Sequence, residues 1–171
     1  MSCVYDKIIS TEGRNMKKVN IYTDGACSGN PGAGGFGVIM EYNGREKEIS
    51  KGYRKTTNNR MELMAVITGL SALKEPCEVH VYSDSKYVVD AIVKEWVYAW
   101  EEKGWVKSDK KPVLNVDLWE ELLFLIEGHA VTFHWVEGHA GHPENERCDK
   151  LAVAASQNSA TEIDEEYESS I

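Results

Sequence analysis

The sequence predicts an α/β fold in which helices pack on a mixed sheet. Two observations predict it. The first third of the chain reads as three consecutive strands, and the rest alternates between helices and strands. With 171 residues, the chain is long enough to bury a core without disulfides or a structural metal. One domain of this class is therefore expected.

The opening strands form an antiparallel meander. Residues 18–24 alternate apolar and polar side chains, which is the period of a strand, and a loop rich in glycine follows them. Residues 36–42 and 45–53 give two further strand patterns. Asn43 and Gly44 join those two, and this pair is a strong signal for a two-residue hairpin turn.

The first helix is expected at residues 59–74, where apolar side chains recur at helical spacing and Asn58 or Asn59 is available as the N-cap. Later helices should end at Gly104 and begin near Pro143. Crossovers between parallel strands should be right-handed. The remaining predicted elements are helices at 85–93, 94–104, 115–127 and 143–155, with strands at 78–84 and 130–136.

The two ends of the chain are expected to lie outside the folded domain. We assign residues 1–16 to a flexible N-terminal extension and residues 17–156 to the catalytic domain. Residues 157–171 carry five acidic side chains and no Lys or Arg, so they predict a disordered tail. The net charge of −9 opposes binding to a phosphate backbone, but much of it belongs to this tail.

The composition is that of a soluble globular protein. No apolar run reaches the length needed to cross a bilayer, and the first residues hold no secretory pattern. A cytoplasmic location without membrane contact is the resulting expectation. The four cysteines are widely scattered, which predicts reduced thiols at Cys3, Cys27, Cys77 and Cys148.

Two strand patterns echo each other, because residues 19–24 and 79–84 both end in a hydroxyl side chain followed by an aspartate. If these strands lie side by side and parallel, Asp24 and Asp84 project together at their carboxyl ends, where α/β sheets place their ligands. Each aspartate alone would more often cap a turn. Together they predict a shared cleft.

Two further acids are weak signals when taken singly. Glu62 falls in the first turn of the first helix, where it suits the helix dipole, and Asp149 lies inside the last helix. If all four carboxylates converge without basic partners, they repel one another unless divalent cations neutralise them. Oxygen ligands of this kind favour Mg²⁺ or Mn²⁺ over Zn²⁺.

Two other sites are disfavoured by spacing. A zinc site would need His134, His139, His142 and Cys148, whose spacing matches no tetrahedral pattern. Residues 32–37 satisfy the dinucleotide fingerprint G-x-G-x-x-G, but a strand pattern follows them where a helix is required. The same stretch lacks the Gly-Lys-Ser/Thr of an NTPase loop. We therefore expect no nucleotide cofactor.

Four segments, at residues 22–25, 56–63, 82–85 and 138–149, closely resemble the bacterial type 1 ribonuclease H family. The resemblance extends from residue 18 to about residue 155. It implies a five-stranded mixed sheet of order 3-2-1-4-5, with three antiparallel strands and then parallel ones, and with helices on both faces.

The resemblance also implies an activity, which is endonucleolytic hydrolysis of the RNA strand of RNA/DNA hybrids. Two Mg²⁺ ions, or Mn²⁺ in their place, would flank the scissile phosphate and leave 5'-phosphate and 3'-hydroxyl ends. A monomer that removes replication primers and R-loops is implied as well. The matching metal-binding and catalytic residues are Asp24, Glu62, Asp84 and Asp149, with Asp24 bridging the ions and His139 carrying a proton.

Expected substrate contacts fall into three groups. The backbone near Gly25, Cys27 and Asn30 can approach the minor groove of the hybrid, where 2'-hydroxyls are exposed. The resemblance assigns contact with base edges or sugars in that groove to Asn58 and Asn59. It also implies a basic protrusion that grips the DNA strand, here with Trp96, Trp100, Lys103 and Trp105. Within the protrusion, Glu101 and Glu102 replace expected basic residues.

Three alternatives remain open from the sequence. An integrase or exonuclease on the same fold would share the acidic cluster, but not the combination of Asn58, Asn59 and His139. A module that holds hybrids without cutting them would more naturally lack a carboxylate. A structural partner acting through the acidic tail is compatible with catalysis.

Overall fold

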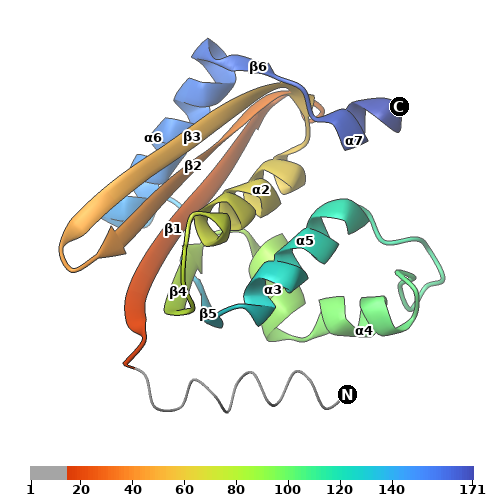
Figure 1. Cartoon of the computed structure of the whole chain (residues 1–171). Helices are drawn as coiled ribbons and strands as arrows, with labels where there is room; N and C mark the ends of the chain where they lie inside the picture. Colours follow the sequence, from red (N-terminus) through yellow and green to blue (C-terminus); the bar gives the residue numbers. More distant parts are fainter. Residues whose placement is uncertain (1–14) are drawn as a thin grey trace.

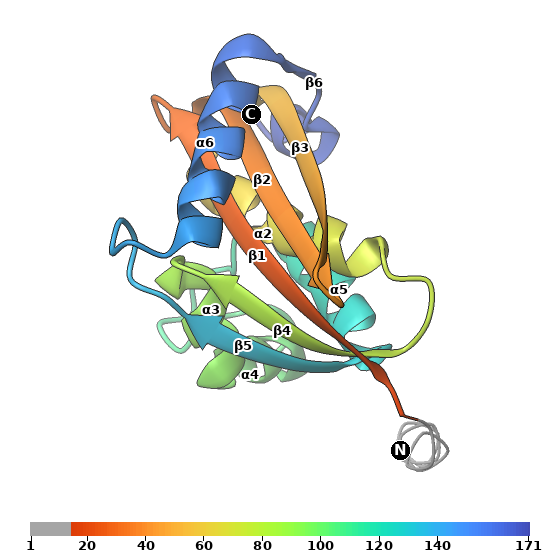
Figure 2. The ribbon, with the colours of Figure 1, turned by 90° about the vertical axis from the view of Figure 1, so that its left-hand side faces the viewer.

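The computed structural model describes residues 15–171, so most of the expected N-terminal extension lies outside the described residues. These residues fold into a six-stranded sheet with helices on both faces (Figures 1 and 2). Within them, no helix combines the length and apolarity required to cross a membrane. In chain order the elements are β1 (Lys17–Ser28), β2 (Gly32–Tyr42), β3 (Arg45–Thr56), α2 (Asn58–Ser71), β4 (Cys77–Ser83), α3 (Lys86–Val93), α4 (Trp96–Glu102), α5 (Val116–Glu127), β5 (Ala130–Trp135), α6 (Pro143–Asn158), β6 (Ala160–Glu162) and α7 (Glu165–Ser169).

The strand order is β5-β4-β1-β2-β3-β6. Strands β1, β2 and β3 are antiparallel neighbours, whereas β4 runs parallel to β1 and β5 parallel to β4. The predicted order of five strands is therefore confirmed. The sixth strand, β6, runs parallel to β3 and was missed, because three residues are too short for a period-2 pattern to be recognised.

The glycine-rich loop expected after Asp24 is mostly strand. β1 continues to Ser28, and β2 already begins at Gly32. A Cβ atom placed on Gly37 would lie 2.4 Å from the backbone oxygen of Cys148, so α6 can rest directly on β2 only because no side chain intervenes. The glycines of β2 thus allow close packing of the helix on the sheet. They lie within a strand, and not in a loop before a helix.

The starts of two helices differ from expectation. The N-cap of α2 is Thr57, whose hydroxyl accepts the N–H of Arg60 at 3.3 Å, so neither expected asparagine is the cap. Because α2 begins at Asn58, Glu62 lies beyond its first turn. Helix α4 begins only at Trp96, after Glu95 takes a left-handed φ of 60°. Pro143 starts α6 as predicted.

The core lies between the central strands and the helices packed on them. Helix α6 crosses one face of β1, β2 and β3, while α2 packs on β1 and β2 from the other face (Figure 2). Ile21, Val79 and Val81 are fully buried and face side chains of α2 and α5. Strands β1 and β4 are therefore held rigidly, and their carboxyl ends are fixed in position.

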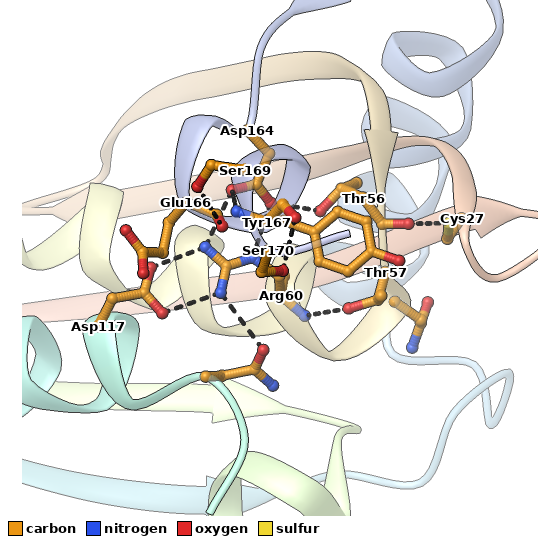
Figure 3. A network of polar contacts seen from close by, with 12 residues as sticks. Cys27, Thr56, Thr57, Arg60, Asp117, Asp164, Glu166, Tyr167, Ser169 and Ser170 are labelled. Atoms are coloured by element: carbon orange, nitrogen blue, oxygen red, sulfur yellow. Dashed lines mark hydrogen bonds and ion pairs between the residues drawn. The ribbon is translucent and has the colours of Figure 1, made fainter.

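The expectation of a disordered acidic tail is wrong. Helix α6 continues to Asn158, β6 extends the sheet, and α7 follows. Asp164 is only 3% exposed and accepts hydrogen bonds from Arg60 and from the hydroxyl of Thr56, each at 2.7 Å (Figure 3). The number of charges in the segment does not reveal these partners. Their hydrogen bonds compensate the cost of burying Asp164.

The Arg60 network joins three elements at the start of α2. All five N–H donors of the guanidinium are used. Asp164 accepts two bonds, at 2.7 and 2.9 Å, and Asp117 of α5 accepts two, at 2.7 and 2.9 Å. Asn115 accepts the fifth at 3.3 Å. Nearby, Arg54 binds Glu168 of α7 at 2.7 Å on the surface.

Candidate active site

The two echoing strands are neighbours, as the sequence predicted. β1 and β4 run parallel with Tyr22 opposite Tyr82, so Asp24 and Asp84 both lie at the carboxyl end of this pair. Asp24, Glu62 and Asp84 each offer one carboxylate oxygen, and these atoms all lie within 4.8 Å of one another. Three of the four predicted carboxylates therefore converge.

Gly25 brings Glu62 to the aspartates. A Cβ atom on Gly25 would lie 2.7 Å from the backbone nitrogen of Glu62, so α2 could not approach β1 this closely past any other residue. The N–H of Gly25 also donates to Oδ1 of Asp24 at 2.9 Å. The role of Gly25 in this structure is to seat the helix that carries Glu62.

The cluster is crowded with negative charge. Burial, followed by the charge of Asp84, raises the pKa of Asp24 to about 7, although hydrogen bonds from Glu62 and Gly25 oppose the rise. Burial and the two aspartates raise the pKa of Glu62 well above its usual range. The charged forms are costly here, because no Lys or Arg of residues 15–171 pairs with these carboxylates.

The donor set fits a hard divalent cation. Glu62 is 4% exposed, and among the described residues its Oε2 atom has no hydrogen-bond partner. A buried carboxylate oxygen without a hydrogen-bond partner lowers the stability of the fold unless a ligand binds to it. Carboxylate oxygens are the ligands that Mg²⁺ and Mn²⁺ prefer. The three acids can therefore hold such an ion.

Asp149 joins the site from the opposite side of β1. It lies outside the tight group of three, but it lines one small pocket with Asp24 and Asp84, and its charge raises the pKa of Asp24. Its neighbour Cys148 anchors α6, because the thiol donates to the backbone oxygen of Tyr22 at 3.2 Å. Burial raises the pKa of Cys148 to about 12, so it stays a thiol and is a poor zinc ligand.

The same pocket contains His139 and a residue that sequence reasoning overlooked. His139 is exposed in the segment before α6, with a left-handed φ of 58°. Asn145 lines the pocket too, and its Nδ2 atom lacks a partner among the described residues. The missed signal was spacing, since Asn145 precedes Asp149 by four residues on one helix face.

The expected groove residues lie along one edge beside the carboxylates. The Asn30 side-chain oxygen accepts the backbone N–H of Asn58 at 3.0 Å. The thiol of Cys27 lies 3.5 Å from the backbone oxygen of Thr56. Asn59 follows in the first turn of α2 and is exposed. The turn after β1 and the start of α2 are thus joined, next to Gly25.

The expected protrusion spans α4 and the segment after it. Trp96 is 46% exposed, and the ammonium of Lys94 lies 5.0 Å from the centre of its ring. Trp100 instead meets the buried Trp119 edge to face at 6.0 Å, and Trp105 packs against the core. Lys103 is exposed. Trp96 and Lys103 are therefore available to a ligand, while Trp100 and Trp105 anchor the protrusion.

Comparisons with known proteins give one consistent family. The RNase H family model matches residues 16–157. The Ribonuclease H of Desulforamulus reducens is 58% identical over 155 residues, covering 91% of this chain and 98% of the relative. The Ribonuclease H of Escherichia coli O9:H4 is 56% identical over 147 residues, covering 86% of this chain and 94% of the relative.

Solved structures agree with the sequence relatives. LC9-RNase H1, described as a type 1 RNase H with the type 2 active-site motif, has a TM-score of 0.74 and 35% identity, over 84% of this chain and 74% of its own. LC11-RNase H1, solved in complex with RNA/DNA hybrid, has a TM-score of 0.62 and 26% identity, over 80% and 95%. The chain therefore belongs to the ribonuclease H family, among its bacterial type 1 members.

Proposed function

We propose that this ribonuclease H cuts the RNA strand of RNA/DNA hybrids with two Mg²⁺ ions held by Asp24, Glu62, Asp84 and Asp149, and that Mn²⁺ can replace them. The observation that carries the proposal is the convergence of Asp24, Glu62 and Asp84 within 4.8 Å without a basic partner among the described residues. The ionised cluster costs stability unless a cation neutralises it, and two-metal sites suit phosphodiester hydrolysis.

The chain's own groups would supply binding, orientation and proton transfer. Bound ions would activate a water for in-line attack and stabilise the charge on the leaving 3'-oxygen, which yields 5'-phosphate and 3'-hydroxyl ends. His139 lies at the rim of the same pocket, exposed to solvent, where an imidazole can exchange a proton with the reacting groups. Asp24, at the centre of the cluster, would be one of the ligands that hold these ions.

Recognition of the hybrid would involve the edge formed by Cys27, Asn30, Asn58 and Asn59 together with Gly25. These groups lie beside the carboxylates, where backbone and amide groups can meet the 2'-hydroxyls of a wide, shallow minor groove. Trp96, Trp100, Lys103 and Trp105 would contribute the grip on the DNA strand. Of these, Trp96 and Lys103 would make the direct contacts.

We further propose a cytoplasmic monomer without a nucleotide cofactor, which removes RNA primers and R-loops. A hybrid-specific cut accounts for both roles, because primers and R-loops both contain an RNA strand paired to DNA. LC11-RNase H1, which shares the fold, has been solved in complex with RNA/DNA hybrid and supports this choice of substrate.

The proposal is tested with a labelled RNA/DNA hybrid in Mg²⁺, beside RNA duplex, DNA duplex and single-stranded RNA. We expect cleavage of the hybrid's RNA alone, and its loss in Asp84→Asn. Asp90→Asn, six residues further along in α3, is the matched control, because the Asp90 carboxylate forms an ion pair with Lys94 at 3.3 Å and lies outside the carboxylate cluster. Binding of an uncut hybrid by the wild-type chain would favour a non-cutting module, and cleavage of DNA duplex would favour a related nuclease.

A further inference from the structure

Two histidines face each other on the outer side of the sheet, away from the carboxylates. His80 of β4 lies opposite Thr132 of β5, and His134 lies opposite Tyr82, so the histidines are diagonal neighbours on adjacent parallel strands. Their rings stack at 5.1 Å, and Nδ1 of His80 lies 2.8 Å from Nε2 of His134. Neither side chain takes part in the proposed hydrolysis.

The pair lies on an accessible part of the sheet. His80 and Tyr82 alternate with the buried Val79 and Val81, so they point to the face opposite α2. Helix α6 lies over β1, β2 and β3 on that face, and Figure 2 shows β4 and β5 beside it. The side chain of His80 is 30% exposed, so solvent reaches part of its ring.

A carboxylate fixes the proton on His80. Oε1 of Glu78 lies 3.3 Å from Nε2 of His80, and a carboxylate can only accept, so Nε2 carries the hydrogen. In the neutral ring, Nδ1 then accepts a hydrogen bond from Nε2 of His134 at 2.8 Å. An ion bound between the two nitrogens would take the place of this proton, with His134 in its other neutral tautomer. Histidines that bind metals usually donate their other ring N–H to a carboxylate, which orients the ring and raises its basicity.

The spacing of the two nitrogens is compatible with two metal ligands at a right angle. With metal-nitrogen bonds of about 2.05 Å, two cis ligands at a right angle stand about 2.9 Å apart, whereas tetrahedral ligands stand about 3.3 Å apart. The observed 2.8 Å fits the right angle. Right-angled nitrogen sites are typical of Cu²⁺ and Ni²⁺, and imidazole is a preferred ligand of both.

We propose that His80 and His134 bind one divalent transition-metal ion of the Cu²⁺ or Ni²⁺ class, with Glu78 holding His80 in the required tautomer. Water completes the coordination on the open side. The ion links β4 to β5 and shares no ligand with the carboxylate cluster, since His80 precedes Asp84 by four residues along the strand, roughly 13 Å. Binding of the transition-metal ion at this site should therefore not depend on Mg²⁺ binding at the carboxylates.

The test is a calorimetric titration of the full chain with Ni²⁺ in excess Mg²⁺, which occupies the carboxylates. We expect one saturable Ni²⁺ site, lost in both His80→Gln and His134→Gln. Glu78→Gln should weaken binding about 10- to 100-fold, because only the orienting group is removed. His142→Gln, at an exposed histidine before α6, is the matched control and should bind as the wild type does.

A second measurement needs no substitution. Ni²⁺ is paramagnetic, so its binding should broaden the NMR signals of Tyr82, whose ring stacks on His134 at 4.7 Å, before those of Tyr167 in α7, which packs on β3, three strands from β4. The proposal is overturned if wild-type protein shows no saturable Ni²⁺ binding in excess Mg²⁺. It is equally overturned if binding survives in both folded histidine variants.

Discussion

Helix α2 carries two buried charged groups, two residues apart, that are built in opposite ways. Arg60 has an acceptor for each of its five N–H donors, supplied by Asp164, Asp117 and Asn115 (Figure 3). Glu62 lies against Asp24 and Asp84 with no basic partner among the described residues, and its Oε2 atom is unpaired. One helix therefore presents a compensated charge and an uncompensated one.

The difference separates a structural site from a functional one. A buried charge with complete hydrogen bonding is retained at little net cost, but removal of either partner is strongly destabilising. A buried cluster of like charges costs stability until an ion enters, so the fold tolerates it only where binding requires it. Substitutions at the two positions should thus have opposite effects on stability.

The largest expected effect is on catalysis in Glu62→Gln. Loss of a ligand that contributes several kcal/mol of transition-state stabilisation should slow hybrid cleavage by at least about a thousandfold. The metal-free chain should become more stable, because Gln needs neither a buried charge nor the proton that Glu62 must take up on folding. Initial rates with a labelled hybrid and urea unfolding in a chelator measure the two effects. A variant that cuts normally, or that is less stable without metal, would contradict the comparison.

The next effect is on stability in Arg60→Met. The substitution leaves Asp164 and Asp117 without their buried cation and should cost about 3–5 kcal/mol in the free energy of unfolding. Urea unfolding measures it. Arg54→Met is the matched control, because its ion pair with Glu168 lies on the surface, and little loss is expected there. Equal losses in the two variants would mean that burial of the network does not matter.

The carboxylate cluster should also give the metal-free fold an unusual pH dependence. Because the folded pKa of Asp24 is raised from 3.8 to about 7, the folded chain keeps a proton that the unfolded chain releases. The contribution of Asp24 to stability should therefore fall as pH rises from about 4 to about 7, by on the order of a few kcal/mol, and Glu62, whose pKa is also raised, adds a loss in the same direction. Thermal unfolding across this range measures the slope.

The same thermal unfolding series in saturating Mg²⁺ tests whether the carboxylates cause the slope. The ion binds the charged carboxylates, so it should reduce the loss of stability at the upper end of the range. Asp24→Asn should flatten the metal-free profile. A wild-type profile that rises between pH 4 and pH 7 in chelator would show that the cluster is not the dominant titrating group.

The smallest of these effects is expected in Asp164→Asn. An amide cannot replace the two charge-assisted bonds to Arg60, but Asp117 remains, so we expect a loss of about 1.5–3 kcal/mol in urea unfolding. The folded fraction should still cut the hybrid, because Asp164 does not reach the carboxylate cluster. Loss of cleavage without loss of stability would instead point to a partner acting through the C-terminal segment.

The sequence was most informative where pattern and chemistry coincide. The matching ends of residues 19–24 and 79–84 located Asp24 and Asp84, because parallel neighbours in a sheet end together. Glu62 became a firm member only through the motif around it, since its position depends on the close approach of α2 past Gly25, which no local pattern encodes.

The errors arose where a distant partner decides the structure. The segment from residue 160 onward has the composition of a disordered tail, yet Arg60, a hundred residues earlier, supplies the charge that fixes Asp164. The asparagines before Arg60 were plausible caps, but the hydroxyl of Thr57 occupies that role. Contacts between residues so far apart are not visible in composition or periodicity.

The short strand β6 covers part of the outer edge of the sheet, where another chain could pair with β3 at high concentration. Without it, the twelve-residue β3 would form the outer edge of the sheet, and an open edge is a template for pairing with another chain. β6 covers β3 at Gly52 and Tyr53, while Lys and Glu side chains occupy much of the rest of that edge. The segment whose composition predicted disorder thus leaves less of this edge open to pairing with another chain.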